Sequence, residues 1–228
     1  GLSPERARDE LVRLLDLPFS LPGLRMMNDL GLLDLLLPEL AAAKGVEQPP
    51  EHAWDVFRHN LEALGFAERI LLPAERAAHP ALREIPWRPE FADHFQEELA
   101  AGRRRAVAFK LAALLHDVGK PQTKAPDPSG RIRFFGHAAL GAEMAEAIMA
   151  RLRFSRREAR LVSRIVEEHL RPIQISQAWE PPTRRAIYRY FRDLEDAAID
   201  TVYLSLADHL AAVGPRFTLE EWRLHTNL

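Results

Sequence analysis

The stretch Leu114-Leu115-His116-Asp117-Val118-Gly119-Lys120 places a histidine and an aspartate side by side at the end of an apolar segment. From Val107 to Asp117 the sequence has the apolar periodicity of a core helix, which Gly119 and Pro121 should end. Burying a histidine beside an aspartate is costly unless the two are paired or coordinate a cation. In this setting the His-Asp pair predicts a metal site; the structural alternative is a hydrogen-bonded pair at a frayed helix end.

Further candidate ligands lie on other predicted helices. They are His59, His137, His169 and Asp208. Singly, each is more typical of a structural residue. Together they give the order His, His-Asp, His, His, Asp, each element from a separate helix, which predicts a centre for one or two divalent metal ions. Asp55, one turn before His59, and His209, beside Asp208, are candidates to orient these ligands.

The composition restricts the chemistry. The chain has 228 residues, 47% of them hydrophobic, which is enough to bury a substantial core. It contains no cysteine, so disulfides, thiol catalysis and thiolate-bound zinc are excluded, and any metal must be held by histidine and carboxylate. There is no signal-peptide pattern, and the longest apolar run, Leu30 to Leu37, is interrupted by Asp34. We therefore expect a soluble cytoplasmic protein with no membrane partner.

Helical periodicity dominates the chain, which predicts an all-α fold. Ser3-Pro4 is a helix start, and a long helix is expected from Glu51. Later helices are expected at about 137–151, 155–170 and 184–213, the last broken near Asp193. Pro49-Pro50 divides a helical neck, residues 1–48, from a second domain, residues 49–228. Within that domain a segment rich in proline and charge predicts an irregular insertion at about 73–102.

The order of candidate ligands resembles the HD superfamily of metal-dependent phosphohydrolases, in which five or more helices bring such ligands to a central metal. The resemblance implies a mononuclear site made of His59, His116, Asp117 and Asp208. In the binuclear subgroup the aspartate of the pair bridges both metals, and His137 and His169 match the two extra histidines. Two sites would lie about 3.5–4 Å apart. The metal could be Mg, Mn, Ni, Fe, Co or Zn.

A second set of motifs resembles the C-terminal half of bacterial tRNA nucleotidyltransferases and poly(A) polymerases. They are Ser3-Pro4-Glu5-Arg6, Leu30-Gly31-Leu32-Leu33, Leu37-Pro38-Glu39-Leu40, Asp55-Val56-Phe57-Arg58-His59, Gly130-Arg131, Phe135-Gly136-His137 and Arg151-Leu152-Arg153-Phe154-Ser155. The Gly-Gly or Gly-Ser turn and the paired aspartates of that family's catalytic head are absent. We therefore expect no nucleotide transfer by these residues. The chain is expected to be a headless relative or a fragment whose partner is an upstream nucleotidyltransferase domain.

Two functional hypotheses follow. The first is a phosphohydrolase acting on a phosphomonoester or a 2′,3′-cyclic phosphodiester in tRNA 3′-end or RNA metabolism. Its expected catalytic residues are His116, Asp117 and Lys120, the last matching the HDxGK lysine that contacts phosphate in the superfamily. Lys120 and Lys124 are two of only four lysines, so they, with Arg131, are predicted to bind the phosphate or nucleotide substrate. The structural alternative is a pair of solvated loop lysines.

The second hypothesis is a non-catalytic RNA-binding fragment of a tRNA nucleotidyltransferase, in which the metal is structural. Its basis is arginine density. The two clusters are Arg151, Arg153, Arg156, Arg157, Arg160 and Arg164, and Arg184, Arg185, Arg189 and Arg192 with Tyr188 and Tyr190. Arg153, Arg156 and Arg157 are the candidate tRNA contacts. A solvated helix face with i,i+4 partners is the structural alternative.

Overall fold

Capping side chains start the helices that build the fold. Ser3, Asp55 and Ser155 each accept a hydrogen bond from the backbone N–H three residues on, and Ser155 forms a complete capping box with Glu158. Each bond satisfies a donor that a helix N-terminus otherwise leaves unpaired. The start of the first helix is confirmed at Ser3-Pro4. The long helix expected from Glu51 begins later, at Val56, because Asp55 is its cap.

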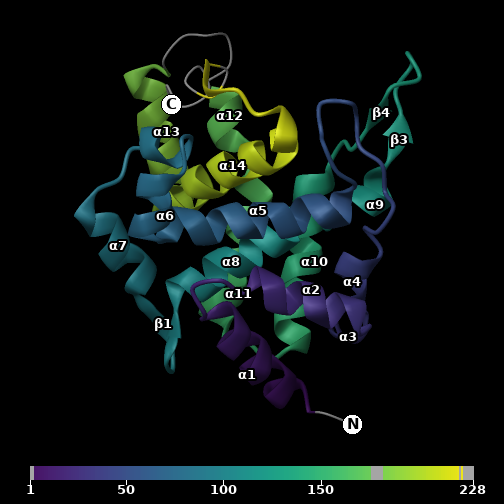
Figure 1. Ribbon diagram of the computed structural model, residues 1–228, viewed down its shortest axis with the longest axis vertical. Coiled ribbons are helices and arrows are strands. Elements are labelled where there is room, and N and C mark those ends of the chain that lie inside the picture. The colour runs from purple at the N-terminus through teal and green to yellow at the C-terminus, as the bar shows by residue number, and fades with distance from the viewer. Residues whose placement is uncertain (1–2, 176–181, 221, 223–228) are drawn as a thin grey trace.

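The computed structural model describes residues 3–175, 182–220 and 222, and helices dominate it (Figure 1). In chain order the helices are α1 (Pro4–Leu15), α2 (Leu21–Asp29), α3 (Leu32–Leu36), α4 (Pro38–Ala41), α5 (Val56–Leu71), α6 (Pro73–Ala78), η1 (Leu82–Glu84), α7 (Pro89–Gln96), α8 (Arg105–Leu115), α9 (Lys120–Thr123), α10 (His137–Arg151), α11 (Arg156–Glu168), α12 (Arg171–Ile175), α13 (Arg184–Leu194), η2 (Glu195–Ala197), α14 (Ala198–Val213) and η3 (Gly214–Arg216). Two short antiparallel hairpins pair β1 (Glu98–Ala100) with β2 (Arg103–Arg104) and β3 (Ala125–Pro126) with β4 (Ile132–Arg133).

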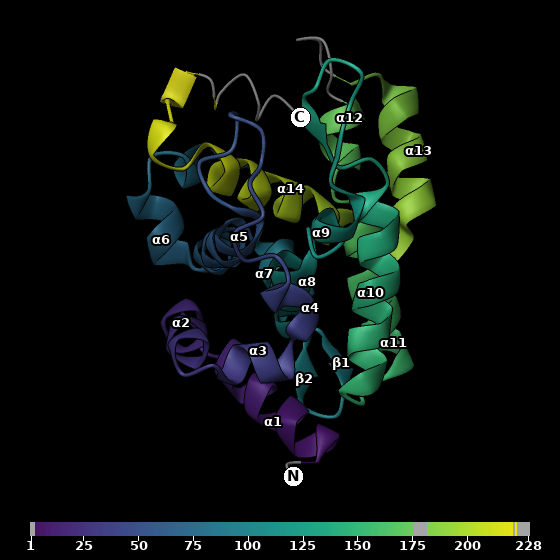
Figure 2. The same cartoon turned by 90° about the vertical axis from the view of Figure 1, so that its right-hand side faces the viewer.

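The centre of the bundle is the contact of α5 with α8. Helix α14 packs along α5, α11 packs on α8, and α10 pairs with α11 on the outer side (Figures 1 and 2). Helix α8 is buried on nearly every side, from Val107 to Leu115, as its apolar sequence predicts. The all-α expectation is therefore confirmed. No helix in the described part of the chain is long and apolar enough to cross a membrane.

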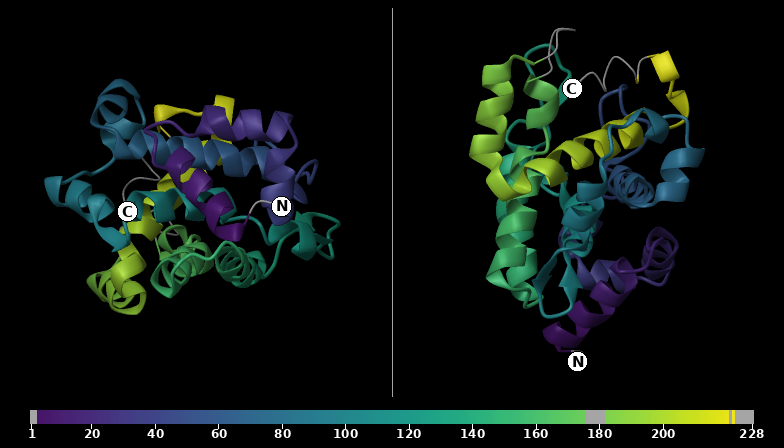
Figure 3. Two further views of the ribbon diagram at one scale, coloured as in Figure 1. Left: turned by 90° about the horizontal axis from the view of Figure 1, so that it is seen from below. Right: turned by 90° about the vertical axis from the view of Figure 1, so that its left-hand side faces the viewer.

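The predicted neck shares its core with the rest of the chain. Leu11, Leu24, Leu33 and Leu40 belong to the same buried apolar cluster as Phe109 of α8. Hairpin β1–β2 lies between α1 and the α10–α11 pair (Figure 3). One of its arginines, Arg104, pairs with Asp16 after α1, and its neighbour Arg103 pairs with Glu158 of α11.

A buried ion pair fastens the neck to the two central helices. Lys110 of α8 donates to the carbonyls of Leu15 and Leu17, where α1 ends, and its Nζ lies 3.3 Å from a Glu68 carboxylate oxygen. That carboxylate, on α5, accepts hydrogen bonds from the backbone and hydroxyl of Ser20, at the start of α2. The unpaired backbone groups between α1 and α2 are thus satisfied by side chains of α5 and α8.

The segment expected to be irregular, about 73–102, has regular structure. Helices α6 and α7 begin with Pro73 and Pro89 at their first positions, where proline needs no N–H partner. Prolines that read as helix breakers therefore start helices here. The helices expected later in the chain are confirmed, including the break after Leu194.

The buried pair of Lys110 and Glu68 predicts a specific loss of stability when it is broken. Lys110→Met keeps the length of the side chain but leaves the Glu68 carboxylate buried without its cation. We expect the free energy of unfolding to fall by about 3–5 kcal/mol, as for other broken buried pairs. Urea denaturation followed by circular dichroism measures it. The control is Lys44→Met, because the Lys44–Asp34 pair is exposed and its loss should cost below about 1 kcal/mol. Equal losses in the two variants would contradict the assignment.

Candidate metal centre

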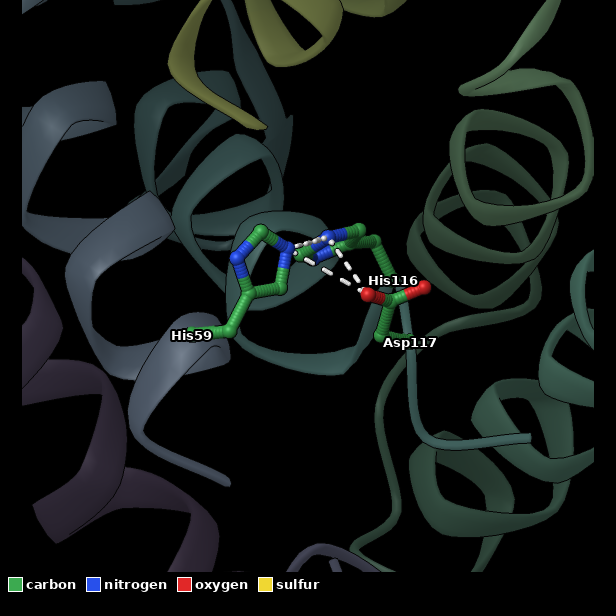
Figure 4. A group of neighbouring side chains, drawn as sticks. All are labelled: His59, His116 and Asp117. Carbon is green, nitrogen blue, oxygen red and sulfur yellow. Dashed lines mark hydrogen bonds and ion pairs between the residues drawn. The ribbon is translucent and has the colours of Figure 1, made fainter. Parts of the chain in front are cut away.

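Asp117 lies at the centre of the cluster that the sequence predicts. His116 caps the C-terminal end of α8, and Asp117 follows it in a tight turn before α9. Both side chains are buried, and Figure 4 shows His59 of α5 directed at the same point. The end of α8 thus supplies two adjacent candidate ligands, and the remaining candidates come from the helices packed around it.

One oxygen of Asp117 faces the first group of candidate ligands. Its Oδ2 lies 3.3 Å from His59 Nε2 and 3.4 Å from His116 Nε2. The two histidine Nε2 atoms are 3.1 Å apart (Figure 4). Asp208 of α14 completes this group, with Oδ1 2.9 Å from His59 Nε2 and 3.5 Å from His116 Nε2. The structure therefore brings together all four residues predicted for a mononuclear site.

The other oxygen of Asp117 faces the second group. Its Oδ1 lies 3.3 Å from Nε2 of His137, the first residue of α10, and 3.8 Å from Nε2 of His169, which caps the end of α11. A carboxylate with one ligand group at each oxygen has the arrangement expected of a bridging ligand.

Backbone carbonyls orient three of the four imidazoles. The Nδ1 atoms of His116, His137 and His169 each donate to the carbonyl three residues earlier, at 2.8, 2.7 and 2.6 Å. This bond places a proton on Nδ1 and directs Nε2 at Asp117, which is the orientation that a metal-ligating histidine needs. His59 differs, since its Nδ1 is buried with no hydrogen-bond partner among the described residues.

A close backbone approach sets the position of His137. A Cβ atom at Gly119 would lie 2.3 Å from the His137 carbonyl oxygen and 2.8 Å from the backbone nitrogen of Gly141. The sequence predicts that Gly119 ends the helix, but its backbone φ of −79° shows that it does not do so by adopting a left-handed conformation. Its small size instead lets α10 pack against the turn that holds Asp117.

The electrostatics favour a cation at this point. Burial alone would raise the pKa of Asp117, but the positive charges of Lys120 and His116 hold it well below the usual value. Burial likewise opposes the charge on His116, but the carboxylates of Asp117 and Asp208 raise its pKa to about 10. Burial and the His116 charge lower the pKa of His169 to about 4. In the protein without metal, protonated His116 and Lys120 together balance the charge of the two carboxylates.

The residues present fit a divalent metal. For bonds of about 2.1 Å, ligand atoms are separated by about 3.0 Å in an octahedron and about 3.4 Å in a tetrahedron. The ligand-to-ligand distances in the cluster, 2.9–3.8 Å, fall close to these values. Apart from the Lys120 ion pair, no donor in the described residues meets hydrogen-bond geometry at either Asp117 oxygen. Three-ligand groups exist on both sides, His59, His116 and Asp117, and Asp117, His137 and His169.

Most of this cluster lies in a segment that matches a known protein family. Residues 90–213 match the model described as "HD domain". The chain belongs to the HD-domain family. His116, Asp117, His137, His169 and Asp208 lie inside the matched residues of the HD domain, and His59 lies before them. Residues 1–44 match a second family, described as "Probable RNA and SrmB- binding site of polymerase A".

The most similar relatives include two tRNA nucleotidyltransferases. The chain is 36% identical to the CC-adding tRNA nucleotidyltransferase of Thermus thermophilus and 35% identical to the A-adding tRNA nucleotidyltransferase of Deinococcus radiodurans. Each alignment covers 92% of this chain and 40% of the relative. The multifunctional CCA protein of Pseudomonas aeruginosa is 29% identical over 74% of the chain and 33% of its own length. The chain therefore spans well under half the length of these relatives.

Of the predicted phosphate-binding residues in this HD domain, only Lys120 lies at the cluster. Its Nζ is 2.5 Å from Asp117 Oδ2 and donates to Gln48 at 2.7 Å. Lys124 is exposed at the end of α9, outside the cluster. The Arg131 side chain is paired with Glu51 and is not among the groups around Asp117.

The predicted RNA contacts lie at the opposite end of α11 from His169. Arg153 and Arg156 are exposed, and Arg157 pairs with Glu97. Arg153 has a left-handed backbone (φ 59°), and its carbonyl accepts a bond from Arg8 of α1.

The sequence interpretation missed one neighbour of the cluster, His52, and misassigned the role of Asp55. The ring of His52 meets the edge of His59 at 5.3 Å, and burial together with the Lys120 charge lowers its pKa to about 4. His52 lies in a loop without a recognisable motif, so its position beside His59 could be recognised only from the structure. Asp55 does not orient His59, because its two oxygens cap α5 and accept the Gly45 N–H. The ring of His209 stacks on Trp222.

The two-sided arrangement predicts metal stoichiometry. We expect two divalent ions per chain in the wild type, one in His169→Ala and none in Asp117→Ala, because Asp117 serves both groups. Elemental analysis after metal loading and desalting measures the ratio. Asp127→Ala is the control, since this carboxylate lies in the β3–β4 turn. Equal metal content in Asp117→Ala and wild type would reject the site.

The raised pKa of His116 predicts how metal affinity depends on pH. A ligand nitrogen must be neutral, so metal binding displaces the His116 proton at any pH below about 10. His169, with a pKa of about 4, releases none near neutrality. We expect affinity to rise by up to about tenfold per pH unit between pH 6.5 and 8.5, measured by chelator competition. The stability of the metal-free fold should fall over the same pH range. A histidine whose pKa is raised on folding stabilises the fold below about pH 6.5, and this stabilisation is lost as the pH rises towards 10. A flat affinity profile would contradict this view.

Proposed function

We propose that this chain is a metal-dependent phosphohydrolase that cleaves a phosphomonoester or a 2′,3′-cyclic phosphodiester at an RNA 3′ end. The observation that carries the proposal is the division of ligands around Asp117, with His59, His116 and Asp208 at one oxygen and His137 and His169 at the other. When bound, divalent ions would lower the pKa of water and polarise a phosphoryl oxygen.

The chain's own residues supply orientation and charge. The hydrogen bonds from Nδ1 to backbone carbonyls hold three imidazoles in place, so these side chains need little rearrangement when a metal or substrate binds. Lys120 is held by Asp117 and Gln48, with its ammonium 5.5 Å from the Phe134 ring. A compact ammonium there can neutralise a phosphate oxygen. Lys124 and Arg131 could contact only parts of a substrate that extend beyond the cluster.

The relatives support the proposed substrate class. Two of them are named as adding nucleotides to tRNA, and the first 44 residues match a family described as RNA-binding. A chain of this kind would meet terminal phosphates and 2′,3′-cyclic phosphates on RNA. We therefore place the reaction in tRNA 3′-end metabolism and assign no nucleotide transfer to these residues.

A second function has support of its own. The match of residues 1–44 to an RNA-binding family favours a non-catalytic module, in which the metal only joins α5, α8, α10, α11 and α14. In that case Arg153, Arg156 and Arg157 would contact tRNA, and metal removal would lower stability without abolishing a reaction.

Hydrolysis of small esters separates the two functions. We expect turnover of 2′,3′-cyclic AMP or bis(4-nitrophenyl) phosphate with nickel, manganese or magnesium, and at least about a thousandfold loss in His116→Ala, which lacks an activating ligand. The matched control, Arg156→Gln with Arg157→Gln, should leave this turnover unchanged while weakening tRNA binding. If the fully metal-loaded wild type turns over neither ester but binds tRNA with a steep salt dependence, the binding module is the correct function.

A further inference from the structure

Helix α13 carries all four of its arginines on one face. At about 100° per residue, Arg184, Tyr188, Arg192, Arg185 and Arg189 fall in that order within a continuous arc of about 140°. Tyr188 is 66% exposed, and the arginines beside it are exposed too. The opposite side of the helix is buried through Tyr190 and Leu194, which pack towards α14. We call the exposed arc the α13 basic face.

The charge of this face is not balanced by its surroundings. Residues 184–194 contain four arginines and one acid, Asp193, in a chain whose net charge is −2. Among the residues that the structure describes, Arg184, Arg185 and Arg189 take part in no ion pair, and Arg192 pairs only with the neighbouring Asp193. Three cations are therefore held on one rigid helix with no partner in the described part of the fold.

Two of the four arginines of α11 are paired within the fold, Arg157 with Glu97 and Arg164 with Glu167 and Glu168. The other two, Arg156 and Arg160, are exposed and take part in no ion pair among the described residues. The groove beside them, about 690 Å³ in volume, is lined by acids as well as arginines: Glu146, Glu167, Asp193, Glu195 and Asp196. The α11 arginines are thus half paired and lie beside an acidic groove, whereas three of the four α13 arginines are unpaired among the described residues, so the α13 basic face is the stronger candidate for an anionic partner.

We propose that the α13 basic face binds the phosphate backbone of RNA, with Tyr188 stacking on a base. Arginine forks contact phosphate oxygens in pairs, and residues one helical turn apart lie about 6 Å from each other, so one strand can contact several in succession. An exposed tyrosine between arginines adds a surface on which any base can stack. This combination gives affinity that is independent of sequence and sensitive to salt.

Ion pairs connect helix α13 to the end of α11, where His169 of the metal cluster lies. Arg171, two residues after His169, pairs with Asp193 of α13 at 2.5 Å and with Glu168 at the end of α11. Helix α13 lies at the outer edge of the molecule beside α12 (Figure 2). An RNA held along α13 would be fixed relative to the ligand His169. This inference names the partner of the proposed function, but RNA binding by α13 does not require hydrolysis.

The test is binding of a fluorescein-labelled tRNA transcript, followed by anisotropy over a series of salt concentrations. EDTA is present, so that metal-dependent cleavage cannot contribute. Arg185→Gln with Arg189→Gln should weaken binding by about tenfold or more and reduce the slope of log affinity against log salt by roughly 1.4, the value for two single-strand phosphate contacts. Tyr188→Ala should weaken binding by about fivefold or more, and Tyr188→Phe should keep most of the affinity.

The matched control is Arg83→Gln with Arg88→Gln, two exposed arginines at and after η1, which remove the same charge elsewhere. It should bind tRNA nearly as the wild type does. The proposal is overturned if both double variants lose affinity equally, if neither does, or if the wild type does not bind tRNA. Ester hydrolysis is measured separately, so its failure alone would reject the enzyme and leave this result intact. Circular dichroism confirms that each variant is folded.

Discussion

A carboxylate buried among apolar helices can stay ionised only if positive charge or a metal is brought to it, and Asp117 imposes this requirement on the fold. Four imidazoles and one ammonium converge on its two oxygens from α5, α8, α9, α10 and α11, with a second carboxylate from α14. Helices α8, α9, α10 and α11 deliver their groups at one end, whereas His59 and Asp208 lie inside α5 and α14. The helical bundle is thus arranged around one charge rather than around its apolar core alone.

The convergence depends on backbone geometry as much as on the ligands. Gly119 allows the His137 carbonyl to approach the turn after α8, and the carbonyls three residues before His116, His137 and His169 fix the rings. A histidine at a helix end can use this local bond because its own backbone is no longer fully inside the helix. The ligands at element ends are therefore oriented locally, whereas His59, inside the first turn of α5, depends on its neighbours.

The sequence was sufficient to predict the class of fold. The six residues that it proposed as ligands lie around one point in the structure, and each could be singled out because a polar residue in an apolar helix interrupts the periodicity. It was not sufficient for contacts made by loops. His52 and Gln48 reach the cluster from a segment without periodicity, and Pro73 and Pro89 resemble breaks unless their position at a helix start is known. The role of Gly119 could be recognised only from the structure, since the sequence does not show which backbone segment packs against it.

The same two helices hold the neck and the metal cluster. Glu68 lies on α5 nine residues after His59, and Lys110 lies on α8 six residues before His116. Their buried pair satisfies the junction of α1 and α2, while the ligands meet further along the same helices. Because a helix is stiff over such lengths, a shift of the neck would have to move α5 against α8, and with them His59 against His116. The segment that matches an RNA-binding family and the candidate hydrolytic centre are thus parts of one packed unit.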